Sequence, residues 1–327
     1  MNSKTKTWLL RTLRTVAIVA PFVWIYAQLD YVELKGVLQR VPYWVLAMAL
    51  LSPLLPMAMQ AFRWWILLRT AVTDLSLWKT LECHFAASFY AMILPGASAQ
   101  EVVRAFILSR QIDYAVVWGS TWLSKLLGLA GWMGIGLLGI AFEKQLLNLG
   151  SFNTHILLFA AAAILSLALI ASFSKRLTRP VRLLSERFVP KSLLKTLTVI
   201  RDAVYVFRTQ HRALAYATIT TFCIQFALIF GTAIVIYGVS GQFFFWPFAV
   251  ILALIEVTIV VLPLTPGGIG LREGLMALLF TRIGIGTEEV GVYIALSFLG
   301  TLSRLVGGIP VVLGRVSQTT RKSAPIE

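Results

Sequence analysis

The sequence predicts an all-α polytopic integral membrane protein with about eight transmembrane crossings, a re-entrant hairpin and two helices broken at Pro-Gly. Three observations support this fold class. Hydrophobic residues make up 58% of the 327 residues and charged residues only 13%, and the mean hydropathy is +0.81. Apolar runs long enough to span a bilayer recur along the chain. Two of these runs are interrupted by proline and glycine and are followed at once by charged residues.

The clearest break lies in residues 261–274, VLPLTPGGIGLREG. Proline removes an amide donor and glycine removes backbone stiffness, so the apolar helix that comes from Trp246 must end there. A charged pair, Arg272 and Glu273, follows directly. Non-helical backbone at membrane depth is tolerated only where protein or a water-filled cavity satisfies its polar groups, so we expect a buried polar site. The breaking residues are Pro263, Pro266, Gly267, Gly268 and Gly270.

A second break is expected at residues 94–104, LPGASAQEVVR. Here Pro95 and Gly96 end an apolar run, and a new helix then carries Glu101 and Arg104. Two interrupted hydrophobic segments in the two halves of a chain point to a transporter-like binding site. Ordinary Pro-Gly loops at the membrane ends, with Arg and Glu reaching toward water, stay open as an alternative.

The first half of the chain is expected to begin in the cytoplasm, because basic residues precede a first span at 12–29. A connecting loop at 30–42 follows on the outer face, and a second span at 43–68 should be kinked by Pro53 and Pro56. If the next apolar run crossed fully, the large basic loop further along would lie outside. We therefore expect residues 80–112 to form the re-entrant hairpin.

The largest polar segment, residues 174–211, holds nine Lys and Arg against two acidic residues. It should therefore be a cytoplasmic loop attracted to anionic lipid, and ordinary topogenic charge is favoured over lipid regulation as the reason for its basic residues. Apolar residues at helical spacing within it predict an interfacial amphipathic helix. These residues are Leu193, Leu197, Ile200, Val204 and Phe207.

The remaining spans complete one transmembrane domain over residues 1–314, with residues 315–327 as a tail and both termini cytoplasmic. The segment after the second break has room for only a short helix. Lys125, Glu256 and Arg304 fall inside apolar segments, so each should have a partner of opposite charge. The expected spans are residues 115–142, 154–173, 213–239, 246–264 and 293–312, with the short helix at 271–284.

The motifs LPGASAQEVVRAFILSR and LPLTPGGIGLREG, with Arg304-Leu305 and the later Gly307-Gly308-Ile309-Pro310, resemble the flippase-like membrane domain of lysylphosphatidylglycerol synthases. The resemblance covers nearly the whole chain. Similar proteins have Gly-Gly where this chain has Ala99-Gln100, and often Asp where it has Glu101.

This resemblance implies a multi-pass protein of the bacterial inner membrane that takes part in lipid transport, moving a phospholipid or lipid-linked headgroup between leaflets. In bifunctional members aminoacyl transfer belongs to a separate soluble domain after the membrane part, so we expect no aminoacylation here. The alternative is a non-transporting membrane scaffold or regulator of an envelope-lipid or lipid-sugar biosynthetic enzyme, with the 174–211 loop as its docking surface.

No catalytic motif supports an enzyme. The three histidines are isolated, no phosphate-binding Gly loop with Lys is present, and the two cysteines lack metal or disulfide spacing. We therefore expect no metal site and no cofactor. The net charge of +15 lies between apolar spans and no nucleic-acid motif accompanies it, so a nucleic-acid partner is not expected.

The partners that we expect are membrane lipids, anionic or phosphate-bearing. The hypothesis is that the half-helices beginning near Gln100 and Leu271 point their N-terminal amides into one cavity, where Arg104 and Arg272 bind a lipid phosphate. Glu101 and Glu273 would hold those arginines when no lipid is bound. A purely structural role, in which these pairs brace the two broken segments, stays open.

Overall fold

The computed structural model describes residues 31–92, 94, 98–142, 148–149, 152–153, 204–205, 207–261, 265 and 268–314, together with positions 23 and 163. It is helical, apart from one short antiparallel pair of strands, β1 (Asn148–Leu149) and β2 (Phe152–Asn153). The helices of the first half are α2 (Tyr31–Arg40), α3 (Tyr43–Leu51), α4 (Leu54–Leu68), α5 (Leu77–Ala91), α6 (Ala99–Leu108) and α7 (Tyr114–Phe142). Those of the second half are η2 (Phe207–Thr209), α11 (His211–Ser240), α12 (Trp246–Val261), α13 (Leu271–Arg282), α14 (Thr287–Leu302), η4 (Ser303–Gly307) and α15 (Gly308–Val312).

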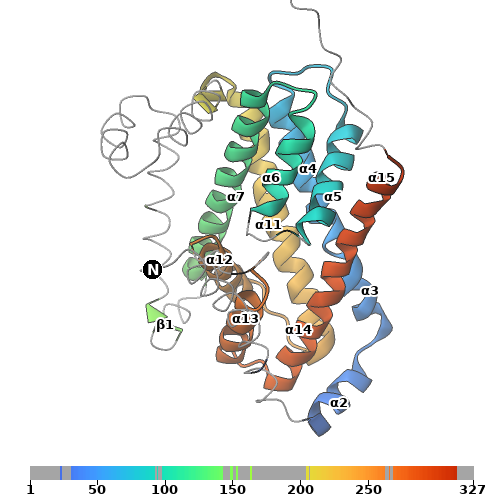
Figure 1. Ribbon diagram of the computed structural model, residues 1–327. Helices are drawn as coiled ribbons and strands as arrows, with labels where there is room; N and C mark the ends of the chain where they lie inside the picture. The colour runs from blue at the N-terminus through green and yellow to red at the C-terminus, as the bar shows by residue number, and fades with distance from the viewer. Residues whose placement is uncertain are drawn as a thin grey trace, which may run out of the picture.

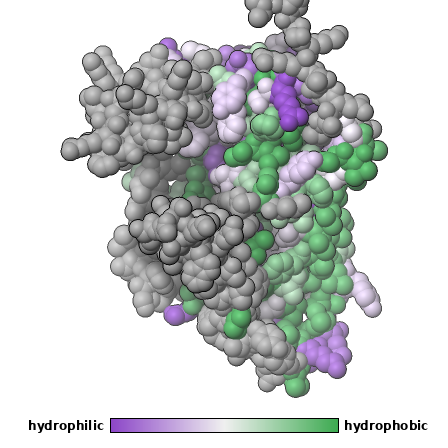
Figure 2. Space-filling view, viewed as in Figure 1, coloured by the Kyte–Doolittle hydropathy of each residue, from purple (hydrophilic) through white to green (hydrophobic). Residues whose placement is uncertain are grey.

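Four helical segments in the described ranges are long and apolar enough to cross a membrane: Tyr43–Leu68, Tyr114–Phe142, His211–Ser240 and Thr287–Val312. They confirm the predicted class, a multi-pass helical membrane protein. Figure 2 shows hydrophobic residues covering the face over α14 and α15. Leu305 of η4 and Ile309 and Val312 of α15 are exposed. Such a face suits contact with lipid chains rather than water.

The kink predicted between residues 43 and 68 separates α3 from α4. Proline at position 53 has no amide hydrogen, so it cannot donate to the carbonyl of Ala49 four residues earlier, and the helix is interrupted at Ser52 and Pro53. Gly300 of α14 packs against this interruption. A Cβ added at Gly300 would lie 3.0 Å from the Ala49 carbonyl oxygen, so glycine allows this close approach.

The glycines of α7 hold it close to α11 and α12. A Cβ at Gly131 would overlap Thr221 of α11, and one at Gly139 would lie 2.8 Å from Val250 of α12. Small residues at such contacts let helix backbones approach closely. The main buried core lies beside this contact, among α7, α11, α12, α13 and α14, with Phe248 and Phe280 fully buried and their rings 4.8 Å apart.

Helices α5 and α6 form a hairpin, and α5 also packs against η4 and α15. The contact with η4 is tight, because a Cβ at Gly307 would overlap the carbonyl oxygen of Phe85. In Figure 1 the α5–α6 hairpin occupies the upper half of the bundle and α12 and α13 the lower half. The two broken segments therefore enter the bundle from opposite ends. Whether the hairpin re-enters a membrane stays a prediction.

Two boundaries differ from the sequence prediction. Residues 30–42 were expected as a loop, but α2 fills most of this range, because Glu33 in its first turn and Arg40 in its last complement the helix dipole. Leu34 and Val37 of α2 also pack against the main core. The final span was expected to begin at residue 293, whereas α14 begins at Thr287. Its start is set by Glu289, which accepts a hydrogen bond from the amide of Gly286.

Several predicted features lie outside the described residues: the spans at 12–29 and 154–173, the tail at 315–327, and all of the 174–211 loop except residues 204–205 and 207–211. In the described part of that loop Val204 and Phe207 are buried, packing with Leu67, Leu123 and Ala217. These two positions of the predicted amphipathic helix therefore contact the helix bundle.

Candidate functional site

The second break is built by glycine. Gly268 and Gly270 have φ angles of 81° and 87°, in the left-handed region that only glycine adopts readily. A Cβ at Gly268 would also lie 2.8 Å from Ile259 of α12, which packs against the returning backbone. Helix α13 then starts at Leu271, as predicted. Pro263, Pro266 and Gly267 lie outside the described residues.

Glu273 caps α13 instead of holding Arg272. Its Oε2 atom accepts a hydrogen bond of 2.6 Å from the Gly270 amide, and the side chain is buried. The expected Arg272–Glu273 pairing is therefore wrong, because the third position of a helix places its carboxylate over the free amides of the first turn. Arg272 instead donates from Nη2 to Oε1 of Glu256 on α12, at 3.1 Å. This ion pair joins the two helices that flank the second break.

The first turn of α6 places Glu101 against Lys125 of α7. Lys125 Nζ donates to Glu101 Oε1 at 2.9 Å, and both side chains are about one quarter exposed, at 25% and 24%. The expected Glu101–Arg104 pairing is thus also wrong. Lys125 and Glu256 both have the opposite-charge partners that their depth predicts, whereas Arg304 has none among the described residues. Pro95 and Gly96 lie outside the described residues.

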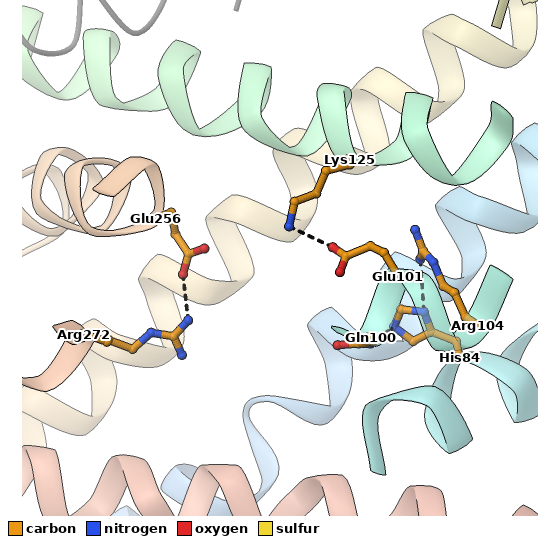
Figure 3. Close-up of polar contacts among 7 residues, drawn as sticks. All are labelled: His84, Gln100, Glu101, Arg104, Lys125, Glu256 and Arg272. Atoms are coloured by element: carbon orange, nitrogen blue, oxygen red, sulfur yellow. Dashed lines mark hydrogen bonds and ion pairs between the residues drawn. The ribbon is translucent and has the colours of Figure 1, made fainter. Parts of the chain in front are cut away.

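Arg104 belongs to a separate buried network. It is 3% exposed, its guanidinium lies 4.6 Å from the centre of the Trp64 ring, and Nη1 lies 3.3 Å from Nδ1 of His84 on α5. Because arginine can only donate, His84 Nδ1 must accept, and its proton lies on Nε2. Gln100 Nε2 lies 3.0 Å from His84 Nε2, and turning the Gln100 amide over by 180° puts its oxygen in that place as the acceptor. Figure 3 shows this network beside the Glu101–Lys125 and Glu256–Arg272 pairs.

One cavity of about 260 Å³, here called the cationic cavity, is lined by Gln100, Arg104 and the members of both ion pairs, but not by His84, Trp64 or Glu273. Its lining holds three more positive than negative side chains. The first turns of α6 and α13 both contribute to it, so the helices that follow the two predicted breaks meet at one polar site. The charged residues are Arg63, Arg104, Lys125, Arg272 and Arg304, with Glu101 and Glu256.

Some arginine N–H donors at the cationic cavity have no hydrogen-bond partner among the described residues. The Nε atoms of Arg63, Arg104 and Arg272 are buried and have no hydrogen-bond partner in the described part of the chain. Buried donors without partners are costly, and an anion would satisfy them. The chemistry of this donor set suits a phosphate-like group that contacts several arginines at once.

Sequence reasoning missed Arg63, which was not among the predicted site residues. Arg63 is 6% exposed and donates from Nη1 to the Thr221 hydroxyl at 3.0 Å. Gln60, three residues earlier on the same helix, also lines the cavity, and this i, i+3 polar pair was an available signal. The roles of His84 and Gln100 were missed too, because they depend on the packing of α5 against α6.

Comparison with known proteins identifies the domain. The family model described as lysylphosphatidylglycerol synthase TM region matches residues 11–307. No curated protein and no solved structure matches the chain significantly. The matched region includes both broken segments and every charged residue of the cationic cavity. The chain therefore belongs to the lysylphosphatidylglycerol synthase TM region family.

Proposed function

We propose that this protein is a flippase-like transporter of the bacterial inner membrane that moves a phospholipid or lipid-linked headgroup between leaflets, with both termini cytoplasmic and no enzymatic step of its own. One observation carries the proposal: the cationic cavity, with three excess positive charges, lies where two broken helices meet. A charged headgroup crossing hydrocarbon loses its water, and a polar cavity that replaces those contacts lowers the barrier.

The contacts suit two different roles for Arg104 and Arg272 in binding the phosphate. Arg104 is held in place by His84 and the Trp64 ring, so it is a fixed donor. Arg272 has one side-chain partner, Glu256, and its side chain is 32% exposed, so it is free to exchange that carboxylate for a phosphate. Arginine binds phosphate through two parallel hydrogen bonds, which compensates for the lost ion pair.

The test is translocation of fluorescent phospholipids and lipid-linked sugars in liposomes that hold the purified protein. An Arg104→Ala/Arg272→Ala variant should lose selective movement. Arg69→Ala/Arg110→Ala is the matched control. It removes the same charge, but from two exposed arginines that do not line the cationic cavity.

Loss of translocation in Arg104→Ala/Arg272→Ala, with translocation retained in the control variant, supports a headgroup site. Equal rates in all three proteins would mean that the charged residues only brace the helices. If no lipid moves although the protein is folded, the scaffold function becomes the better proposal, and deletion within the 174–211 loop should then release its partner enzyme.

A further inference from the structure

Two arginines in the wall of the cationic cavity carry charge that no described carboxylate neutralises. Arg63 of α4 is 6% exposed and Arg104 of α6 is 3% exposed, and neither forms an ion pair with a described residue. Both carboxylates in the cavity lining already belong to the two ion pairs described above. Buried positive charges in a membrane-spanning bundle are costly unless an anion compensates them.

The side chain of Arg63 is fixed from two sides. Its Nη1 atom donates to the Thr221 hydroxyl of α11 at 3.0 Å. A Cβ added at Gly128 of α7 would lie 3.6 Å from both Nη1 and Nη2, so glycine lets the guanidinium lie against this helix. The Nε atom of Arg63 is buried and has no hydrogen-bond partner among the described residues. The guanidinium is therefore held in the cavity wall rather than extended toward water.

Ser124 of α7 lies at the same helix contact. The residues one turn before and one turn after it on α7 contact Trp64 and Arg63 of α4, so Ser124 faces α4 between these two contacts. The Arg104 guanidinium lies 4.6 Å from the centre of the same Trp64 ring. The two arginines and Ser124 therefore converge on one part of the wall, and all three line the cationic cavity.

The Ser124 hydroxyl is an unused donor. On the same helix the hydroxyls of Ser120 and Thr121 donate to the Val117 carbonyl, at 2.9 Å and 2.8 Å. The Ser124 hydroxyl is fully buried and has no partner among the described residues. Arginine can only donate, so the ligand that matches this part of the wall is an acceptor with negative charge. A water molecule would satisfy the hydrogen bonds but leave the charge uncompensated.

We infer that a small inorganic anion of the halide class binds between Arg63 and Arg104, with the Ser124 hydroxyl as a third donor. Hydrogen bonds from arginine to an anion are strong, and a spherical anion accepts them from any direction. It therefore suits donors that arrive from the three helices α4, α6 and α7. This ion is a resident ligand of the cavity wall, and the inference holds whether or not the protein moves a lipid.

Melting curves of the full-length protein in uncharged detergent test this inference, with sodium chloride exchanged for sodium gluconate at constant ionic strength. Gluconate is a large organic anion that should not enter the site. Chloride at about ten times its dissociation constant should raise the melting temperature by about 3–6 °C. Arg63→Gln should abolish this dependence on chloride, and the milder variant Ser124→Ala should weaken chloride binding about tenfold.

Two matched controls should keep the native dependence on chloride. Arg69→Gln removes the same charge from the exposed end of α4, and Ser88→Ala removes a buried hydroxyl that already donates to the Phe85 carbonyl. Neither residue lines the cationic cavity. Crystals grown in bromide should in addition show anomalous density between Arg63 and Arg104.

Equal melting temperatures in chloride and gluconate, or an undiminished chloride dependence in Arg63→Gln or Ser124→Ala, would overturn the inference. Bromide density confined to exposed residues, an adventitious ion only, would overturn it too. So would stabilisation by dihexanoyl phosphatidic acid in gluconate but not by chloride, because the occupant would then be a lipid phosphate. Chloride dependence without lipid translocation in liposomes would keep the anion site and refute the proposed transport.

Discussion

The ion pair between Glu101 and Lys125 gives the sharpest test of how the first broken segment is held. At the observed 2.9 Å, Coulomb attraction is about 6 kcal/mol for an effective dielectric constant of about 20. Both side chains are about a quarter exposed, at 25% and 24%, so water roughly doubles the dielectric constant and halves that energy. We expect a coupling free energy of about 2–3 kcal/mol.

A double-mutant cycle measures this energy. Glu101→Gln removes the carboxylate that pairs with Lys125, in a cavity lining already rich in cations. Lys125→Met removes the ammonium group that pairs with Glu101. Each single variant should lower the free energy of unfolding in mixed detergent, and the double variant should recover most of the loss. A coupling below about 0.5 kcal/mol would refute the reasoning, because the pair would then behave like an exposed salt bridge.

Three further predictions concern the rest of the site. Gly307→Ala should destabilise the protein by about 3 kcal/mol or more, because its Cβ would overlap the Phe85 carbonyl, whereas Gly36→Ala, with nothing within 4 Å, should not; equal melting temperatures would contradict this. Arg272→Lys should keep the fold but lower lipid translocation several-fold, because lysine cannot make the two parallel bonds to phosphate; a native rate in liposomes would count against phosphate binding. If Glu256 couples transport to protons, Glu256→Gln should abolish any dependence of the rate on a pH gradient, and an unchanged dependence would exclude that role.

Helix positions could be predicted because they depend on local chemistry. The second break is specified by the proline and glycine residues between α12 and α13, and the structure places the start of α13 at the predicted Leu271. The kink at Pro53 follows from a missing amide in the same way. Such features need no knowledge of what the helices contact.

The pairings could not be predicted, because they depend on which helices become neighbours. Glu101 and Arg104 are three residues apart on one helix and could have paired. Instead Glu101 pairs with Lys125 of α7, and Arg104 contacts His84 of α5. Gln100 shows the same limit. It stands where related sequences are expected to have glycine, and in the structure its side chain joins the His84 network.

The glycine contacts of α7 restrict how this protein can move. Gly131 and Gly139 bring their backbone directly against Thr221 of α11 and Val250 of α12. A glycine has no side chain that could change rotamer to follow a shifting neighbour, so α7, α11 and α12 should travel as one rigid body. The α5–α6 hairpin meets this body in a buried apolar cluster that includes Leu108 of α6 and Val117 of α7, and through the Glu101–Lys125 ion pair, which can exchange partners. If the cationic cavity opens alternately to the two leaflets, the hairpin should rotate relative to the three-helix body. The Glu101–Lys125 ion pair would then have to break at each opening.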